Sequence, residues 1–337
     1  MTALAELTTM RVGGTPSVLT IAATEAEIIE AVDAADDADQ ELLIIGGGSN
    51  LIVADDFTGQ VLKIASTGYE NDSTVCAGAW VTVQAGHNWD DFVADCVNNG
   101  WLGVEALSGI PGTVGATPIQ NVGAYGQQVS ETIAQVRAWN RETKKIDTIF
   151  AANCEFGYRT SVFKKYPNRW VILSVTFQLP LGDISSPIKY NELAVYFNKE
   201  IGDRVSAQKL RAGVLELRAG KGMLLDSTDH DSWSVGSFFM NPRVTQPPQD
   251  APAWPEADGR FKVSAAWLIE QAGFGKGFGL NDRATLSTKH TLAITNRGQA
   301  SSDDILELAR HVRNGVKAKY GIELQPEPKL VNCSLDN

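Results

Sequence analysis

Residues 103–127 read GVEALSGIPGTVGATPIQNVGAYGQ, and the interpretation of the whole chain starts from this stretch. Six of its 25 residues are glycine, too many for the interior of a helix or strand, and it has too few charges for a solvated surface loop. Between the glycines lie compact donors and acceptors, Thr113, Thr117, Gln120 and Asn121, which suit the edge of a heteroaromatic ring or phosphate oxygens. The alternative is a long loop with a purely structural purpose.

A second glycine-rich segment favours the ligand-binding interpretation. Residues 41–56, ELLIIGGGSNLIVADD, predict an apolar strand, a turn at GGGSN and a further extended run. Consecutive backbone N–H groups at the end of a strand can form an anion-binding concavity. Leu51 stands where the dinucleotide fingerprint requires its third glycine, and no helix follows. The segment is therefore a candidate phosphate loop of a non-Rossmann kind, with a tight strand connection as the alternative.

The composition of the chain limits the classes of protein to which it can belong. The 337 residues have room for two or three domains, and 43% apolar with 20% charged residues is typical of a soluble globular protein. No apolar run reaches the roughly 18 residues of a membrane span, and the N-terminus lacks the pattern of a signal peptide. The net charge of −11 argues against nucleic acid as a partner. The four histidines show no metal-ligand spacing, so we expect no metal site. The cysteines are widely separated and indicate reduced thiols in the cytoplasm: Cys76, Cys96, Cys154 and Cys333.

The periodicity of the chain predicts an α+β fold. A polar, proline-containing excursion covers 180–191, and we expect the proline-rich residues 242–258 to form a loop. Helices are expected at 24–39, where Thr24 is the cap, and at 90–101, 205–219, 264–274 and 303–319. Strands are expected at 17–22, 133–140, 144–150 and 170–179.

Six segments, in order along the chain, together resemble the MurB family, the UDP-N-acetylenolpyruvoylglucosamine reductases. The resemblance runs from about Arg11 to Val331, nearly the whole chain. The segments are RVGGTPSVL (11–19), IIGGGSNLIV (44–53), PIQNVGAYG (118–126), GYRTSVFK (157–164), GSFFMNP (236–242) and LQPEPKLV (324–331).

The resemblance implies a vanillyl-alcohol-oxidase/PCMH-type FAD-binding fold with a separate α+β substrate domain. The implied domains are an FAD subdomain at 1–66 with the tail 329–337, a second FAD subdomain at 67–220, and a substrate domain at 221–328. It also implies non-covalent FAD, NADPH as hydride donor, and reduction of the enolpyruvyl ether of UDP-N-acetylglucosamine-enolpyruvate to UDP-N-acetylmuramate in peptidoglycan precursor synthesis. The partner is then a small molecule and not a membrane, and we expect a monomer.

The family's functional residues map onto this sequence. Arg159 matches the arginine that grips the substrate carboxylate, Ser237 the serine that protonates the enolate, and Glu327 the glutamate that assists. The residues implied for the UDP-sugar are Tyr158, Arg159, Tyr190, Lys221, Asn241 and Lys289. The residues implied for FAD are Gly46, Gly47, Gly48, Ser49, Asn50, Ser108, Gly109, Pro111, Gly112, Gly115, Ala116, Gln120, Asn121, Gly123, Ala124 and Tyr125.

Without the resemblance, these residues have simpler interpretations. An isolated arginine in a loop is usually part of a surface salt bridge, and a serine after glycine is usually a turn hydroxyl. Two positions depart from the family pattern: Met240 stands where some members carry lysine, and Gly-Met-Leu-Leu-Asp follows Lys221 in place of Leu-Pro-Asp-Pro. GFGKGFG (273–279) is expected to be a turn, because it follows a helix and precedes none.

Two other functions compete with the reductase. The first is an FAD-dependent alcohol or sugar oxidase of the same superfamily, in which a histidine near the phosphate loop often tethers the flavin. Here no histidine is closer in sequence than His87. The second is a nucleotide-sugar sensor without turnover, against which all three catalytic matches count.

Overall fold

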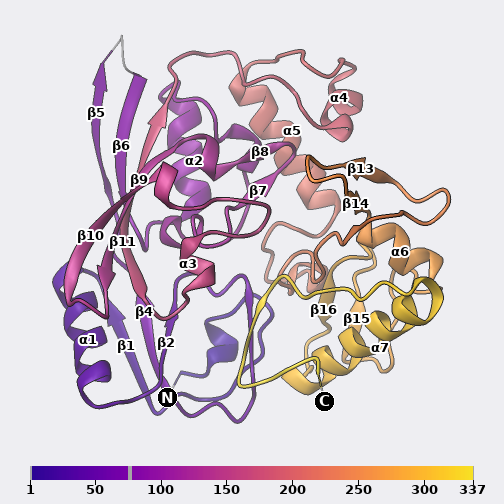
Figure 1. Ribbon diagram of the computed structural model, residues 1–337, viewed down its shortest axis with the longest axis horizontal. Coiled ribbons are helices and arrows are strands. Elements are labelled where there is room, and N and C mark those ends of the chain that lie inside the picture. The colour runs from indigo at the N-terminus through magenta and orange to yellow at the C-terminus, as the bar shows by residue number, and fades with distance from the viewer. Residues whose placement is uncertain (1, 75–77, 337) are drawn as a thin grey trace. The chain divides into compact units, whose positions relative to one another are not determined.

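The computed structural model describes residues 2–74 and 78–336 and groups them in two compact units (Figure 1). Each unit has a hydrophobic core of its own. The large unit comprises Ser17–Gly47 and Gly59–Ala219, and the small unit comprises Met1–Pro16, Gly48–Thr58 and Gly220–Asn337. The division into three domains at 1–66, 67–220 and 221–328 stays a prediction beside this grouping.

The first sheet of the large unit is parallel, with the order β1-β4-β2. Its strands are β1 (Val18–Ala22), β4 (Gln60–Ile64) and β2 (Leu42–Ile45). Helix α1 (Glu25–Asp37) packs against β1 and β4. Thr24 and Glu27 form a capping box at its start, so the predicted cap is confirmed. Because the strands are parallel, the turn that follows Ile45 leaves from the carboxyl edge of the sheet, where such sheets bind ligands.

The second sheet of the large unit is antiparallel, with the order β10-β9-β11-β6-β5, and Figure 1 shows its long strands side by side. The central strand, β11, is buried along almost its whole length, as its apolar sequence dictates. The strands are β5 (Tyr69–Thr74), β6 (Gly78–Gln84), β9 (Ile133–Asn140), β10 (Lys145–Phe150) and β11 (Trp170–Leu179). The remaining elements are α2 (Trp89–Asn98), β7 (Gly123–Ala124), β8 (Gln127–Gln128), α3 (Val162–Lys165), α4 (Asn191–Phe197) and α5 (Ala207–Gly220).

The small unit combines short sheets with two helices. Helix α7 (Ser302–Tyr320) packs on β15 (Ala284–Leu286) and β16 (Ile294–Asn296), and its apolar face enters the core of the unit. The parallel pair β3–β17 joins Leu51–Val53 to Lys329–Val331. The other elements are β12 (Arg243–Val244), β13 (Ala253–Pro255), β14 (Phe261–Val263) and α6 (Ala265–Gln271).

Most of the predicted helices and strands are confirmed, and one expectation is wrong. Residues 242–258 are not simply a loop, because β12 and β13 pair with β14 on either side. Proline fits at position 255 because it is the last residue of β13, an edge strand, where the missing backbone N–H is not needed as a donor. Helix α4, directly after Tyr190, was not predicted, since the polar excursion before it dominates the local pattern.

Two further observations concern the class of protein. Among residues 2–74 and 78–336, none of the helices has the length and apolar content needed to cross a membrane. Cys96, Cys154 and Cys333 are free thiols, and Cys76 lies outside the described residues.

Candidate active site

The two glycine-rich segments meet within the large unit. Gly46 and Gly47 follow β2 directly and lie against Gly112 and Thr113 of the 103–127 stretch. A Cβ atom on Gly47 would come within 2.7 Å of the Gly112 Cα, so this approach requires glycine. The contact joins the candidate phosphate loop to the stretch with which the sequence analysis began. The rest of the turn, Gly48–Asn50, belongs to the small unit, where the Asn50 carbonyl accepts a hydrogen bond from Lys329 N–H at 3.0 Å.

The start of the 103–127 stretch holds its shape without a regular helix or strand, because side chains satisfy its backbone polar groups. Such bonds replace the ladder that an irregular buried segment lacks. They are Gly103 N–H to Glu105 Oε2 (2.6 Å), Ala106 N–H to Gln127 Oε1 (2.7 Å), Trp89 Nε1–H to Leu107 O (3.0 Å), Gly109 N–H to Asp90 Oδ1 (2.6 Å) and Arg218 Nε–H to Gly109 O (3.1 Å).

Two side chains implied for FAD face inward. Ser108 Oγ donates to the Glu105 carbonyl at 2.7 Å. Asn121 is buried, and its Nδ2 donates to Gln128 Oε1 and to the Gly157 carbonyl, each at 3.1 Å. These side chains shape the stretch from inside, and any contact that they make with a cofactor stays a prediction.

The accessible part of the stretch is uncharged. Its half-buried or exposed residues present backbone and small side chains, and this donor set fits a neutral ring system lying against the loop. These residues are Gly103, Ile110, Pro111, Gly112, Thr113, Ala116, Ile119, Gln120, Val122, Gly123, Ala124 and Gly126. Three non-glycine residues here adopt the left-handed region, Asn121 (φ 48°), Tyr125 (φ 48°) and Arg159 (φ 53°). Backbone conformations of this kind gather at functional sites.

Arg159 is fixed to this stretch. Its Nη2 donates to the Gly123 carbonyl at 2.8 Å, and its guanidinium lies 5.5 Å from the centre of the Tyr158 ring. Because Asn121 also holds the Gly157 carbonyl, the turn that carries Tyr158 and Arg159 is tied to the stretch from both sides. An arginine held in this way is not the mobile surface cation of the simpler interpretation.

Ser237 and Glu327 lie in the small unit, and a backbone ladder brings their segments together. Glu327 N–H donates to the Phe238 carbonyl at 2.8 Å, and Met240 N–H donates to the Gln325 carbonyl at 3.0 Å. Phe238 and Phe239 are buried in the core of the unit and fix the chain on which Ser237 sits. Two segments far apart in sequence are thus aligned at these two predicted catalytic residues.

Two of the residues implied for the substrate have structural partners. Tyr190, in the large unit, precedes α4, is 45% exposed, and packs edge-on against Tyr125 with ring centres 5.6 Å apart. Asn241, in the small unit, accepts a hydrogen bond through Oδ1 from Ala265 N–H at 2.9 Å and so holds the start of α6.

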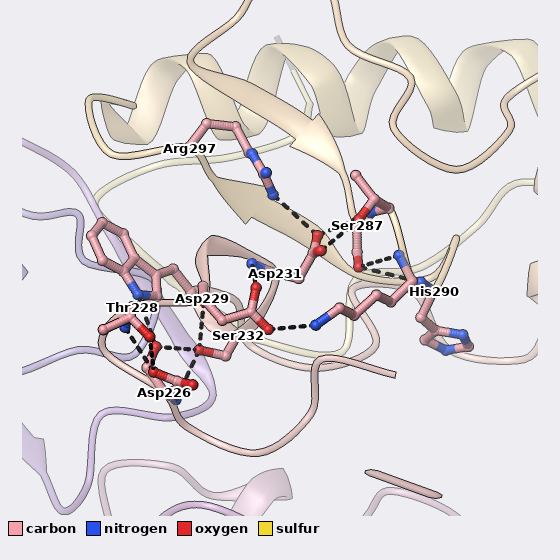
Figure 2. A network of polar contacts seen from close by, with 11 residues as sticks. Asp226, Thr228, Asp229, Asp231, Ser232, Ser287, His290 and Arg297 are labelled. Atoms are coloured by element: carbon pink, nitrogen blue, oxygen red, sulfur yellow. Dashed lines mark hydrogen bonds and ion pairs between the residues drawn. The ribbon is translucent and has the colours of Figure 1, made fainter. Parts of the chain in front are cut away.

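Lys289 belongs to a polar network around residues 226–232, which we call the acidic turn (Figure 2). Its ammonium pairs with Asp229 at 2.6 Å, and this hydrogen bond raises the pKa of Lys289. Figure 2 shows the Asp231 carboxylate facing Arg297, 3.0 Å away. Asp231 also accepts hydrogen bonds from the N–H and hydroxyl of Thr288, at 2.9 and 2.5 Å. The role of Lys289 in binding stays a prediction, and it would require competition with Asp229.

Two lysines act on His290: Lys221, which the resemblance implied for the UDP-sugar, and Lys276, which the sequence analysis did not assign. Burial lowers the pKa of His290 to about 4, and the charges of Lys221 and Lys276 act in the same direction, so both lysines lie within electrostatic reach of the ring. Lys276 stands in GFGKGFG, which the structure places in turns between α6 and β15 as predicted. A local sequence signal could have paired these two lysines, because Lys221 and Lys276 each stand in a Gly-Lys-Gly tripeptide.

Comparison with known proteins agrees with this arrangement. Residues 16–147 match a family model described as an FAD binding domain, and residues 227–331 match the C-terminal domain of UDP-N-acetylenolpyruvoylglucosamine reductase. A reductase of that name from Cutibacterium acnes is 51% identical, over 98% of this chain and 90% of the relative. One from Streptomyces avermitilis is 50% identical, over 98% of this chain and 94% of the relative. The crystal structure of the Thermus caldophilus enzyme covers 98% of this chain and 97% of its own, with a TM-score of 0.66 at 23% identity, and so shares the fold.

The fold and the matched domains define a flavoprotein oxidoreductase that uses FAD. The expected fold class is thereby confirmed. The chain belongs to the UDP-N-acetylenolpyruvoylglucosamine reductase family, the MurB enzymes of peptidoglycan synthesis.

Proposed function

We propose that the chain reduces the enolpyruvyl ether of UDP-N-acetylglucosamine-enolpyruvate to the lactyl ether of UDP-N-acetylmuramate, with NADPH as the hydride donor. When bound, the flavin supplies the hydride from N5. Hydride addition to the terminal carbon of the enol ether leaves an enolate next to the substrate carboxylate. The protein must stabilise this charge and supply a proton to complete the reduction.

Three residues share this work in the proposal. Arg159 pairs through its planar guanidinium with the substrate carboxylate and the enolate oxygen. Ser237 donates the proton to the enolate carbon, and Glu327 assists that transfer. A serine hydroxyl is a weak acid, so it needs assistance from a neighbouring group, and the candidate in the same unit is the carboxyl group of Glu327.

The observation that carries the proposal is the ladder between residues 238–240 and 325–327. It hydrogen-bonds Glu327 to the residue next to Ser237, although the two segments are far apart in sequence. Two residues implied by separate motifs are thereby held on adjacent segments, which supports a joint chemical role. The rigid placement of Arg159 on the glycine-rich stretch supports the flavin side of the proposal.

The experiment that tests the proposal separates the two half-reactions. In Ser237→Ala, anaerobic reduction of the flavin by NADPH is expected to stay near the wild-type rate. Reoxidation by the UDP-enolpyruvyl sugar is expected to fall by about 10²–10⁴-fold, the usual contribution of a proton donor. Ser264→Ala is the matched control, because Ser264 caps α6 in the same unit and has no proposed chemical role. Equal damage to both half-reactions in Ser237→Ala would remove Ser237 from the role of donor.

The competing oxidase has a specific residue to test. The His87 carbonyl accepts a hydrogen bond from Val114 N–H at 2.9 Å, so this histidine adjoins the glycine-rich stretch although it is distant from GGGSN in sequence. Its Nδ1 accepts from Gly68 N–H at 3.2 Å. We expect denaturation to release all of the flavin, as non-covalent binding requires. Flavin that stays attached to the denatured chain would favour the oxidase.

A further part of the proposal concerns assembly and location. We propose a monomer in the cytoplasm, and the free thiols of Cys96, Cys154 and Cys333 support the location. Light scattering of the holoenzyme as it elutes from a size-exclusion column measures the mass of the particle directly. A mass twice that of the 36.3 kDa chain would contradict the monomer.

A further inference from the structure

Both polar groups of Gly109 are held by charged side chains from two different helices. Asp90, in the first turn of α2, accepts from Gly109 N–H at 2.6 Å. Arg218, in the last turn of α5, donates through Nε to the Gly109 carbonyl at 3.1 Å. Gly109 is buried and has φ 71°, a conformation that side-chain-bearing residues rarely adopt. This bend of the stretch therefore depends on side chains that lie outside it.

The two charged residues belong to a larger ionic group. Arg211, two turns before Arg218 on the same face of α5, forms two bonds with Asp90, Nη1 to Oδ1 at 2.6 Å and Nη2 to Oδ2 at 3.0 Å. Burial would raise the pKa of Asp90, but the bonds from Arg211 and Gly109 outweigh it and keep the carboxyl ionised. Arg218 is only 8% exposed, and guanidinium groups keep their charge even when buried. Burying a charge of this kind costs free energy, because the charged group loses its water, so its position at Gly109 needs an explanation.

We propose that Asp90, Arg211 and Arg218 form a charge clamp that sets the bend at Gly109 and thereby the affinity and orientation of FAD. All three are positioning residues in this proposal, which rests on the proposed function of the glycine-rich stretch as the flavin loop. None of the three is among the residues that the sequence analysis assigned to FAD, to the substrate or to catalysis.

The bend leads directly to the contact between the two glycine-rich segments. Gly112, three residues after Gly109, abuts Gly47, where no Cβ atom has room. A shift of the bend would therefore displace both loops together. Arg218 also acts on the far end of the stretch, because its charge opposes the rise to about 12 that burial causes in the pKa of Tyr125. One arginine thus reaches the stretch at Gly109 and near Tyr125.

The test measures FAD release from the holoenzyme on dilution, followed by flavin fluorescence. Arg218→Met keeps the apolar stem but removes the donor to Gly109, whereas Arg218→Lys keeps a charge and a donor. Asp90→Asn keeps an acceptor for Gly109 N–H and weakens the ion pair with Arg211. The matched control is Arg141→Met, because Arg141 forms a similarly shielded ion pair with Asp36 in the same unit, away from the stretch.

We expect Arg218→Met to release FAD about tenfold faster or more, a change of about 1.4 kcal/mol, and to shift the visible flavin spectrum. Arg218→Lys should recover most of the affinity, and Arg141→Met should match the wild type in rate and spectrum. If Arg218→Met fails to fold, Asp90→Asn carries the test with the same expected direction.

Wild-type release and spectrum in Arg218→Met would overturn the clamp. Equal acceleration in Arg141→Met would also overturn it, because the effect would then reflect general stability. A wild-type protein that binds no FAD would contradict the proposed function itself, and that result is distinct from either failure of the clamp.

Discussion

The glycine-rich stretch at 103–127 and the acidic turn at 226–232 are both irregular, yet they are held in different ways. The stretch is fixed by side chains from other elements, among them Trp89, Asp90 and Arg218, and most of its first seven residues are buried. The acidic turn is largely held by its own short-range bonds, such as those of Asp226 with Thr228 and Ser232. The fold thus presets the conformation of the glycine-rich stretch, whereas the acidic turn presents charged groups that remain partly open to solvent.

The largest effect should follow from removing a buried carboxylate in the glycine-rich stretch. Glu105 is fully buried and accepts from Gly103 N–H and Ser186 N–H, each at 2.6 Å. Glu105→Ala leaves the amides of two half-buried residues without acceptors and should lower the free energy of unfolding by about 4 kcal/mol, measured by urea denaturation. The control is Glu142→Ala, whose pair with Arg169 is exposed. A loss in Glu105→Ala no larger than in the control would contradict the preset conformation.

The next effect is a pH dependence next to the acidic turn. Because the pKa of His290 is about 4 in the folded protein and 6.5 ordinarily, the unfolded chain binds the extra proton between these values. Stability should therefore fall as the pH drops from about 6.5 to about 4, by about 3 kcal/mol from this residue. His290→Gln should remove that part of the loss in urea denaturation. An identical pH profile in wild type and variant would contradict the lowered pKa of His290.

The smallest effect on stability should come from the exposed pair of the acidic turn. Lys289 and Asp229 are 37% and 28% exposed, and such pairs are worth about 0.5 kcal/mol or less. Lys289→Met should hardly change the urea midpoint, whereas the KM for the UDP-sugar should rise if Lys289 binds the substrate. Asp229→Asn separates the roles, because it frees the ammonium. An unchanged KM in both variants would remove Lys289 from the substrate site.

The sequence was most informative where a local pattern has one physical meaning. The Thr24 cap, the apolar strand β11 and the glycines at 46, 47 and 112 could be interpreted from residue types alone, because caps, buried strands and close backbone approaches each demand particular residues. The resemblance to the family supplied the functional residues, and the ladder at Phe239 is consistent with two of them.

The rest depends on tertiary contacts that no local pattern encodes. Nothing in the sequence around Asp90 or Arg218 connects them with Gly109, since they meet only when α2 and α5 pack beside the stretch. Strands β12 and β13 were missed for the same reason, because their pairing with β14 outweighs a proline-rich composition. The inward bonds of Asn121 likewise follow from the position of Gly157.

The most direct test of the account is an anaerobic visible spectrum of the purified protein, first with NADPH and then with UDP-N-acetylglucosamine-enolpyruvate. The account predicts a flavin spectrum that NADPH bleaches and that the UDP-sugar restores without oxygen, which would identify the cofactor, the hydride donor and the acceptor in one cuvette. A colourless protein that takes up no FAD would contradict the account. A flavin that is reoxidised only by oxygen would contradict the reductase and favour the oxidase.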